Sequence, residues 1–385
     1  MKNPHVALLI ETSNAYARGL LEGVTAYLRE HRSWAIYLSE HGRGDSVPAW
    51  LRGWKGSGII ARVENRRIAE AVKDCGLPTV DLSAARLLPD VPWVETDNEA
   101  IARLALDHLR ARGFRNVGFC GLTDYNWSVW RCEHFQRLAK EAGLACHVHM
   151  ARARSDRAAD WSSEQSELAR WVTSIPRPAG VMACFDIRGR QLLEACRAAG
   201  VRVPDDVAVV GVDNDSVLCE LSNPPLSSVI PDTRRTGYMA AELLDRMMSG
   251  RRVPARPHLL KPLGLAARKS SDALAIGDAD VSAAVRYIRD HACEGIGVGQ
   301  VLQVVPLSRR VFESRFAKLV GRTPHQEIVR VQVERAGELL RETDLPLKAI
   351  AERVGVRHAE YLSVLFKRAT GSPPGVYRRE HRSGA

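Results

Sequence analysis

Residues 5–230 alternate short apolar runs with amphipathic segments, and this alternation restricts the possible folds more than any other feature of the chain. The apolar runs have the length of strands and lie at 6–10, 35–38, 58–60, 79–82, 117–120, 181–185 and 207–212. The amphipathic segments have helical spacing and lie at 19–30, 66–75, 100–112, 133–142, 164–175 and 189–199. Apolar strands that alternate with helices predict parallel sheets covered by helices on both faces.

The strand count is too high for one compact sheet, and the pattern starts again after about residue 113. We therefore expect two similar α/β lobes with a cleft between them. A strand and helix at 226–244 and one further strand-like run at 259–265 follow. Several predicted helices end at a glycine that suits a left-handed C-cap, namely Gly76, Gly113, Gly143 and Gly200.

Polar and aromatic residues directly follow four of the predicted strands. Ligands of such folds bind outside the carboxyl ends of strands, so these residues are candidates for a binding site. The candidates are Glu11, Tyr16, Arg18, Trp127, Trp130, Arg131, Asp186, Arg188 and Asp213. Carboxylates and guanidinium groups can each bind two hydroxyls, and an indole face covers the C–H side of a sugar ring. The set predicts a small polyhydroxylated ligand, although each residue alone is also typical of a helix N-cap or a surface charge.

The C-terminal quarter contains two segments with the pattern of a helix-turn-helix, at 298–316 and 347–368. In each, a short apolar-periodic helix is followed by a tight turn and by a second helix that ends in apolar, Phe and basic residues. Such a pair presents its second helix to the major groove of DNA. Phe312, Phe316, Leu362 and Phe366 recur at helical spacing, which predicts that they form the core.

The charge of the chain supports a polyanionic partner. The whole sequence has a net charge of +10, with 55 Lys and Arg against 45 Asp and Glu. Residues 281–385 contain 18 Lys and Arg against 11 Asp and Glu, so +7 of that charge lies in this segment. A basic segment with helix-turn-helix patterns is typical of DNA binding, and a solvated basic surface is the alternative.

Cysteine usage and hydropathy predict a reduced, cytoplasmic protein with no membrane partner. The eight cysteines are scattered without a CxxC pair, and several lie in apolar runs, as buried thiols do. The N-terminus is too poor in apolar residues for a secretory signal, and no apolar run has the length of a transmembrane helix. The segment 146–149, Cys-His-Val-His, has no second cluster to complete four metal ligands, so we predict a plain strand there.

Enzyme classes find little support. The segment 56–58, Gly-Ser-Gly, lacks the third glycine of a dinucleotide fingerprint, and neither GxxxxGK[ST] nor GxSxG occurs. Carboxylates beside a sugar could indicate glycoside hydrolysis, but a hydrolase has no use for a basic helix-turn-helix segment. We predict a non-enzymatic protein without a cofactor.

Three segments of the α/β part carry a family resemblance: Val-Val-Gly-Val-Asp-Asn at 209–214, Pro-Leu-Ser-Ser-Val at 225–229 and Thr-Gly-Tyr-Met-Ala-Ala-Glu-Leu-Leu at 236–244. They resemble the sensor domains of LacI-type repressors, which share the periplasmic sugar-binding fold. The resemblance implies that Arg131, Asp186 and Asp213 contact a sugar. LacI-type repressors carry their helix-turn-helix at the N-terminus, and this chain does not.

The C-terminal part resembles the AraC-type DNA-binding domain, on Ser-Arg-Arg at 308–310, Gly-Arg-Thr-Pro-His-Gln-Glu-Ile at 321–328, Glu-Arg-Ala-Gly-Glu-Leu-Leu at 334–340 and Gly-Ser-Pro-Pro-Gly-Val-Tyr-Arg at 371–378. The resemblance implies that the DNA-contacting residues are Arg309, Arg310, Glu313, Ser314, His358, Ala359, Glu360, Ser363, Lys367 and Arg368. Many members have arginine where this chain has Ser314, Gln332 and Val364. The second unit is therefore expected to provide mostly phosphate contacts and shape reading.

A LacI-type sensor placed ahead of an AraC-type domain resembles the family of bacterial xylose operon regulators. Residues 16–18, 96–98, 287–296 and 300–302 also look like that family. The resemblance implies a homodimeric activator that binds D-xylose, an operator in double-stranded DNA and RNA polymerase. We expect a sensor domain at 1–268, with lobes at 1–105 plus 230–268 and at 106–229, a linker at 269–280, and a DNA-binding domain at 281–385. Two alternatives remain: another sugar or a non-sugar effector, and a sugar-binding or transport protein.

Overall fold

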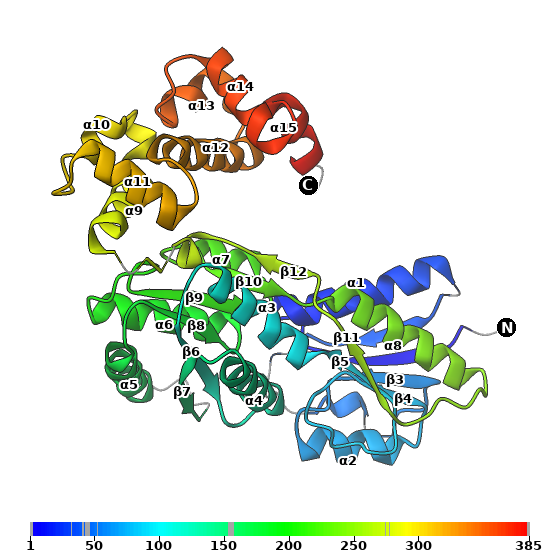
Figure 1. Cartoon of the computed structure of the whole chain (residues 1–385). Coiled ribbons are helices and arrows are strands. Elements are labelled where there is room, and N and C mark those ends of the chain that lie inside the picture. The colour runs from blue at the N-terminus through cyan, green and yellow to red at the C-terminus, as the bar shows by residue number, and fades with distance from the viewer. Residues whose placement is uncertain are drawn as a thin grey trace. The chain divides into compact units, whose positions relative to one another are not determined.

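The computed structural model describes residues 3–382 except 32, 41, 43–46, 52, 153–157, 274 and 277, and it describes only the backbone of 158–161, 342 and 380–382. The chain divides into two compact units, Met1–Ala273 and Leu274–Ala385 (Figure 1). The first unit is the expected pair of α/β lobes, and the second consists of helices. The predicted fold class is confirmed.

The first lobe is a six-stranded sheet whose paired strands all run parallel. In spatial order its strands are β11 (Pro257–Leu260), β5 (Trp93–Thr96), β4 (Thr79–Asp81), β3 (Gly58–Ala61), β1 (His5–Leu9) and β2 (Ala35–Leu38). A short 3₁₀ turn, η1 (Ala49–Leu51), follows β2 in the chain.

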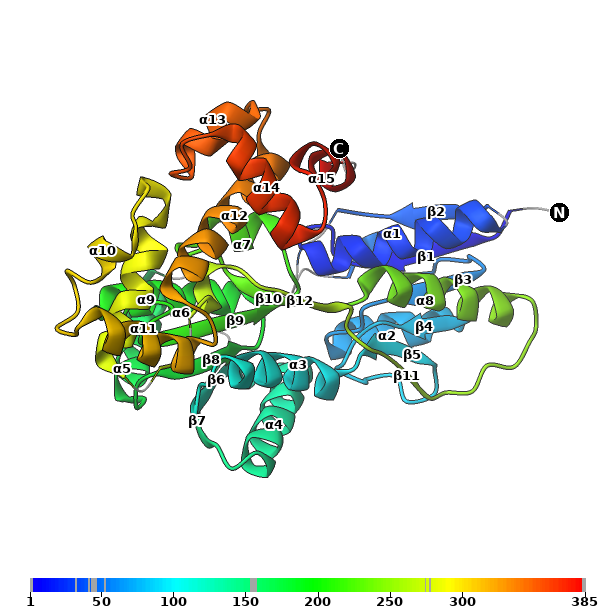
Figure 2. The same cartoon turned by 45° about the horizontal axis from the view of Figure 1, so that its top comes forward.

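Alternation along β1 gives the first lobe two cores. Val6 and Leu8 pack with residues of α1 (Ala15–Glu30) and α8 (Thr233–Met248), which lie side by side over one face of the sheet (Figures 1 and 2). Ala7 and Leu9 point to the other face and pack with α2 (Arg66–Cys75). Because strand residues alternate between faces, a continuous apolar run fills both cores.

The second lobe repeats this plan with one antiparallel edge strand. Its order is β12 (Gly264–Ala266), β10 (Ser227–Ile230), β9 (Val207–Val212), β8 (Ala179–Ala183), β6 (Asn116–Leu122) and β7 (Ala145–Ala151), and β12 pairs antiparallel with β10. Its helices are α3 (Asn98–Ala111), α4 (Asn126–Glu141), α5 (Ala158–Ser174), α6 (Asp186–Ala198) and α7 (Ser216–Leu221). Phe119 of β6 meets Phe135 of α4 on one face, and Cys120 packs with α5 and α6 on the other.

The apolar run expected at 259–265 as one strand forms parts of two strands in two sheets. β11 pairs with β5 in the first sheet, and β12 pairs with β10 in the second. The chain therefore passes between the sheets three times: from β5 to α3, from β10 to α8, and from β11 to β12. The expected lobe boundaries differ from this arrangement, since α3 packs against α4 and the strand at 264–266 belongs to the second sheet.

Residues 269–271 were expected in the linker, but they are part of the first unit. They form a 3₁₀ turn, η2 (Lys269–Ser271), in which both serines are fully buried. Ser270 Oγ donates to Val209 O at 2.6 Å and accepts from Ser227 N at 2.8 Å. Ser271 Oγ lies 2.7 Å from His108 Nε2. A run of small hydroxyl residues has the composition of a linker. The sequence alone does not show that these serines are buried, because their hydrogen-bond partners lie far away along the chain.

The second unit contains two helix-turn-helix pairs joined by one long helix. The first pair is α10 (Val298–Val301) and α11 (Arg309–Val320), preceded by α9 (Ala279–His291) and η3 (Ala292–Glu294). The second pair is α13 (Leu347–Arg353) and α14 (Ala359–Thr370), followed by α15 (Pro374–Arg382). The helix between them, α12 (Pro324–Glu342), contributes Ile328 to the core of the first pair and Leu340 to that of the second.

A close contact between two glycines links the two pairs. Gly295 and Gly355 both have a left-handed backbone, with φ of 78° and 72°. A Cβ atom on Gly355 would lie 2.4 Å from the backbone nitrogen of Gly295. Glycine is therefore required where these turns meet. Gln332 of α12 reinforces the junction, because its Nε2 donates to Ala292 O at 2.9 Å.

Candidate functional site

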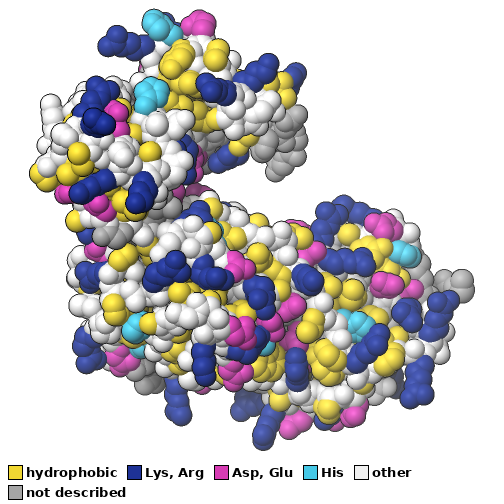
Figure 3. Space-filling view, in the orientation of Figure 1, with side chains coloured by type: hydrophobic (Ala, Val, Ile, Leu, Met, Phe, Trp, Pro, Cys, Tyr) yellow, Lys and Arg dark blue, Asp and Glu magenta, His cyan; other side chains and the backbone are white. Residues whose placement is uncertain are grey.

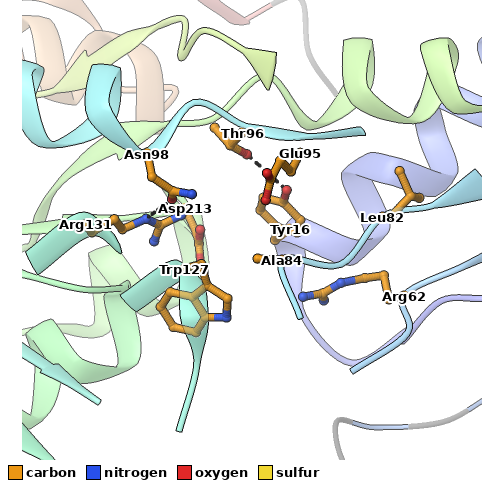
Figure 4. A pocket seen from close by; sticks show the side chains of 10 residues that line it. All are labelled: Tyr16, Arg62, Leu82, Ala84, Glu95, Thr96, Asn98, Trp127, Arg131 and Asp213. Atoms are coloured by element: carbon orange, nitrogen blue, oxygen red, sulfur yellow. Dashed lines mark hydrogen bonds between the residues drawn. The ribbon is translucent and has the colours of Figure 1, made fainter. Parts of the chain in front are cut away.

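A narrow pocket of about 40 Å³ lies in the first unit, at the carboxyl ends of strands from both sheets (Figure 4). Polar, charged and aromatic side chains line most of it. They are Tyr16, Arg62, Leu82, Ala84, Glu95, Thr96, Asn98, Trp127, Arg131 and Asp213. Because both lobes contribute residues, a ligand in this pocket contacts both of them.

Arg62 is the buried cation on the first-lobe side of the pocket. It directly follows β3, and its two terminal nitrogens donate to Glu11 Oε2 at 2.7 Å and to Glu64 Oε1 at 2.6 Å. The guanidinium lies over the Tyr16 ring, 5.3 Å from its centroid. Burial alone would lower the pKa of Arg62, but the charges of Glu64 and Glu11 outweigh burial and raise that pKa. The guanidinium is thus held rigidly and fully charged.

Two residues of β5, Glu95 and Thr96, face the pocket beside Tyr16. Tyr16 OH and Thr96 Oγ1 form a hydrogen bond of 3.0 Å. Glu95 forms an ion pair with Arg86 through Oε1, while its buried Oε2 has no hydrogen-bond partner among the described residues. Burial raises the pKa of Glu95. A buried carboxylate oxygen without a partner is an acceptor that a ligand hydroxyl can satisfy.

Arg131 of α4 is the corresponding cation on the second-lobe side. Its Nε donates to Asn98 Oδ1 at 2.9 Å and its Nη1 to Cys184 O at 2.5 Å. The guanidinium lies over the Trp127 indole at 5.1 Å, and Phe185 meets the same indole edge-on at 5.5 Å. Burial lowers the pKa of Arg131, and the negative charge of Asp213 opposes this effect.

Asp213 reaches the pocket from a strained backbone immediately after β9. Its φ is 107° and that of Asn214 is 49°, and residues other than glycine rarely adopt positive φ values. Such strain costs on the order of 1–3 kcal/mol and concentrates at functional sites. Asp186 lies behind it, where Oδ1 accepts from Ser228 Oγ at 2.6 Å and Oδ2 from Asp215 N at 2.8 Å. Burial, and then the charge of Asp213, raises the pKa of Asp186.

This set of groups suits an uncharged ligand with several hydroxyls. Arg62 and Arg131 supply donors, Glu95 and Asp213 supply acceptors, and Trp127 supplies an apolar face. Within the described ranges no group of three or more His, Cys, Asp or Glu could hold a metal ion. The segment 146–149 lies in β7, as expected for a plain strand.

In the second unit, α11 and α14 bury one face and expose the other. Phe312 and Phe316 are fully buried on α11, as are Leu362 and Phe366 on α14, which confirms the prediction that they form the core. Arg310 of α11 is exposed. Lys and Arg side chains are spread over the face of the helical unit seen in Figure 3.

Three domain families match the chain in succession. The XylR N-terminal domain matches residues 5–99, the periplasmic binding protein-like domain matches 106–271, and a helix-turn-helix domain matches 302–380. The order agrees with two lobes followed by a helical unit.

Full-length relatives have the same combination. The xylose operon regulatory protein of Escherichia coli (strain K12) is 33% identical over 387 residues, which cover 98% of this chain and 97% of the relative. The chain belongs to the family of xylose operon regulatory proteins. The Haemophilus influenzae relative is 32% identical and covers 97% of each chain. A solved structure of the xylose-binding transcription activator xylR matches with a TM-score of 0.80 and 32% identity over 99% of both chains.

As a xylose operon regulatory protein, the chain is a transcription regulator with a DNA-binding unit at its C-terminus. Among the residues that the structure describes, no helix combines the length and apolar composition needed to cross a bilayer. All eight cysteines are free thiols.

Within this regulator, four of the nine candidate residues for ligand binding line the pocket. They are Tyr16, Trp127, Arg131 and Asp213.

Four further candidates lie outside the lining, and so does Trp130, described below. Glu11 and Asp186 are buried immediately behind it, bonded to Arg62 and Ser228. Arg18 is exposed and donates to Thr12 O at 3.2 Å. Arg188 is fully buried in the second lobe, where it forms an ion pair with Glu164 of α5.

The remaining lining residues of the regulator were not expected. Arg62 lies two residues after the strand predicted at 58–60, so the strand-end rule identifies it once it is applied to β3. Glu95, Thr96 and Asn98 lie on or after β5, where the segment 93–96 is too short and too polar for a strand pattern. Trp130, also a candidate from the sequence, lies under the guanidinium of Arg86 at 4.3 Å instead of lining this pocket.

The expected DNA-contacting residues differ in exposure. Arg309, Arg310 and Ser314 are exposed, and Glu313 pairs with Arg309 at 2.9 Å. In the second helix-turn-helix pair the exposed residues are His358, Glu360, Lys367 and Arg368, whereas Ala359 and Ser363 are half-buried. Gln332, where many relatives were expected to have arginine, is buried.

Proposed function

We propose that this chain is an activator that responds to D-xylose, which binds in the pocket between the two lobes of the first unit. One observation carries the proposal: guanidinium and carboxylate groups from both lobes line one pocket together with the Trp127 side chain, in a chain that matches the xylR activator over 99% of its length. The choice of xylose follows from the relatives, which are described as xylose operon regulatory proteins and as a xylose-binding transcription activator.

The roles of the pocket residues follow from their chemistry. Asp213 and Glu95 accept hydrogen bonds from sugar hydroxyls, and Arg62 and Arg131 donate to hydroxyl oxygens. Trp127 covers the C–H side of the ring. Because these groups belong to different lobes, a bound sugar favours the arrangement of the lobes in which all of them reach it. The sugar can shift the equilibrium only by its differential affinity for the two arrangements.

On the DNA side, α11 and α14 lie in successive major grooves of an operator. A single chain reads one half-site with its two helix-turn-helix units, so we propose a homodimer on a repeated site. The same proposal includes RNA polymerase as the partner that an activator recruits, and the cytoplasm as the location. The basic surface of the second unit supports the DNA partner.

The proposal is tested on the full chain by isothermal titration calorimetry and thermal shift, with D-xylose, L-arabinose, D-ribose and D-glucose. A ligand at about one hundred times its Kd stabilises the folded protein by about 2.7 kcal/mol. We expect binding of D-xylose, its loss in Asp213→Ala, and unchanged sugar-free DNA binding in that variant. A stronger response to another sugar in the panel contradicts the effector, and equal loss of sugar and DNA binding in Asp213→Ala contradicts its role in the pocket.

A further inference from the structure

The second helices of the two helix-turn-helix pairs, α11 and α14, have equal lengths and a similar pattern of buried and exposed positions. α11 spans Arg309–Val320 and α14 spans Ala359–Thr370, so each residue of α11 corresponds to the residue 50 positions later. The buried Phe312 and Phe316 correspond to the buried Leu362 and Phe366. Gly321 and Gly371 end the helices with φ of 78° and 80°. The outward faces can therefore be compared residue by residue.

The centres of these outward faces differ in chemistry. The α11 position occupied by Ser314 corresponds to Val364, which is 63% exposed. The position before the first fully buried residue is Val311 on α11 and Tyr361 on α14, and Tyr361 is 52% exposed. One position earlier, Arg310 is replaced by Glu360. The middle of α14 therefore presents exposed apolar surface and lacks the arginine that α11 presents.

The C-terminal ends of the two faces remain alike. Lys318 of α11 and Arg368 of α14 occupy corresponding positions, and both are exposed. Lys367 adds a second exposed cation to α14. A helix that exposes valine at its centre and two cations in its last turns suits a partner that carries an apolar group between negatively charged groups. Duplex DNA is such a partner.

The major groove offers one apolar group on its base edges, the C5-methyl of thymine. We propose that Val364, flanked by Tyr361, reads thymine methyl groups, so that the half of the site under α14 is specified by the positions of its thymines. This proposal rests on the DNA-binding role stated above and names what the second unit recognises. It differs from the expectation that the second helix-turn-helix pair contributes mostly phosphate contacts and shape reading.

The test uses the full chain and DNA selected by that chain from a randomised duplex pool. Each thymine of the selected site is replaced in turn by deoxyuridine, which removes the methyl group and keeps every hydrogen-bonding group. Affinities are measured by fluorescence anisotropy for the wild type, Val364→Ala and Ser314→Ala. Val364 and Ser314 are both exposed and occupy corresponding positions of the two helices, so both changes leave the cores intact.

We expect at least one thymine whose replacement weakens wild-type binding about fourfold, the value for one buried methyl group. Val364→Ala should be insensitive to that replacement, whereas Ser314→Ala should keep the full effect. Equal sensitivity of Val364→Ala and wild type, or no sensitive thymine under α14, overturns the proposal. Undiminished DNA binding by Val364→Ala with lost transcription activation also overturns it and assigns the patch to a protein partner. If no sequence is enriched from the pool, the DNA-binding proposal itself fails, which is a distinguishable result.

Discussion

The side-chain oxygen of Asn98 accepts a hydrogen bond of 2.9 Å from Nε of Arg131, and both residues line the pocket. Asn98 is the first residue of α3, immediately after the chain crosses from the first sheet to the second. The crossing thereby orients the Arg131 guanidinium in the pocket, which links the path of the backbone to the geometry of the pocket.

Asn98→Ala should weaken sugar binding. A hydrogen bond to a charged group contributes roughly 1.5–3 kcal/mol, so we expect a loss of affinity of about tenfold or more. Titration calorimetry with D-xylose measures the effect. Asn116→Ala is the matched control, because Asn116 bonds to Pro178 O at the opposite end of β6. Equal affinities of the two variants would show that Asn98 does not orient Arg131.

Asp81 predicts a pH dependence of stability. Its Oδ1 accepts from Val63 N and Ser83 N, while its buried Oδ2 has no partner among the described side chains and backbone groups. Burial raises the pKa of Asp81 to about 7 from an ordinary value of 3.8. Between these values the folded chain holds a proton that the unfolded chain has released. Stability should therefore fall as pH rises from about 4 to about 7, by on the order of 2–4 kcal/mol.

The variant Asp81→Asn isolates this group. The amide keeps the acceptor at Oδ1 and carries no charge, so the difference in Tm between variant and wild type should grow in favour of the variant as pH rises from 5 to 8. Thermal unfolding at a series of pH values measures it. A constant difference across that range would contradict the raised pKa.

Gly23→Ala should destabilise the first lobe. A Cβ atom at Gly23 would lie 2.0 Å from the carbonyl oxygen of Arg234, because α1 and α8 pack backbone to backbone there. Overpacking of this kind costs about 1–3 kcal/mol. Gly375→Ala is the control, since that helical glycine has open space around its Cβ position. Chemical denaturation followed by circular dichroism should separate the two variants, and similar midpoints would contradict the close packing.

Arg310→Ala should lower specific DNA binding about ten- to a hundredfold, the contribution of one arginine to a guanine edge, while sugar affinity stays unchanged. Lys318→Ala should instead weaken binding to all sequences alike and reduce the salt dependence by about one counterion. Anisotropy titrations at several salt concentrations distinguish these outcomes. If operator binding survives Arg310→Ala unchanged, α11 does not read bases through this residue.

Local patterns predicted the elements of this chain well. Strands at 35–38 and 207–212 and the helix at 66–75 have the predicted bounds, because periodicity and capping depend on near neighbours. The glycines at 76, 113, 143 and 200 all have left-handed φ, between 61° and 86°. β5 escaped prediction because its segment at 93–96 has too few apolar residues in a run.

The sequence by itself determined two α/β lobes, a basic helical unit with two helix-turn-helix pairs, and strand-end residues such as Asp213. The tertiary structure decided which of those residues line the pocket. Tyr16 and Thr96 meet although they are 80 positions apart, and Asn98 meets Arg131 only because the chain crosses between the sheets beside them. Hydrophobic periodicity in the sequence shows which side of a helix or strand is apolar. It does not record the order of strands in a sheet, and that order brings distant polar side chains into one pocket.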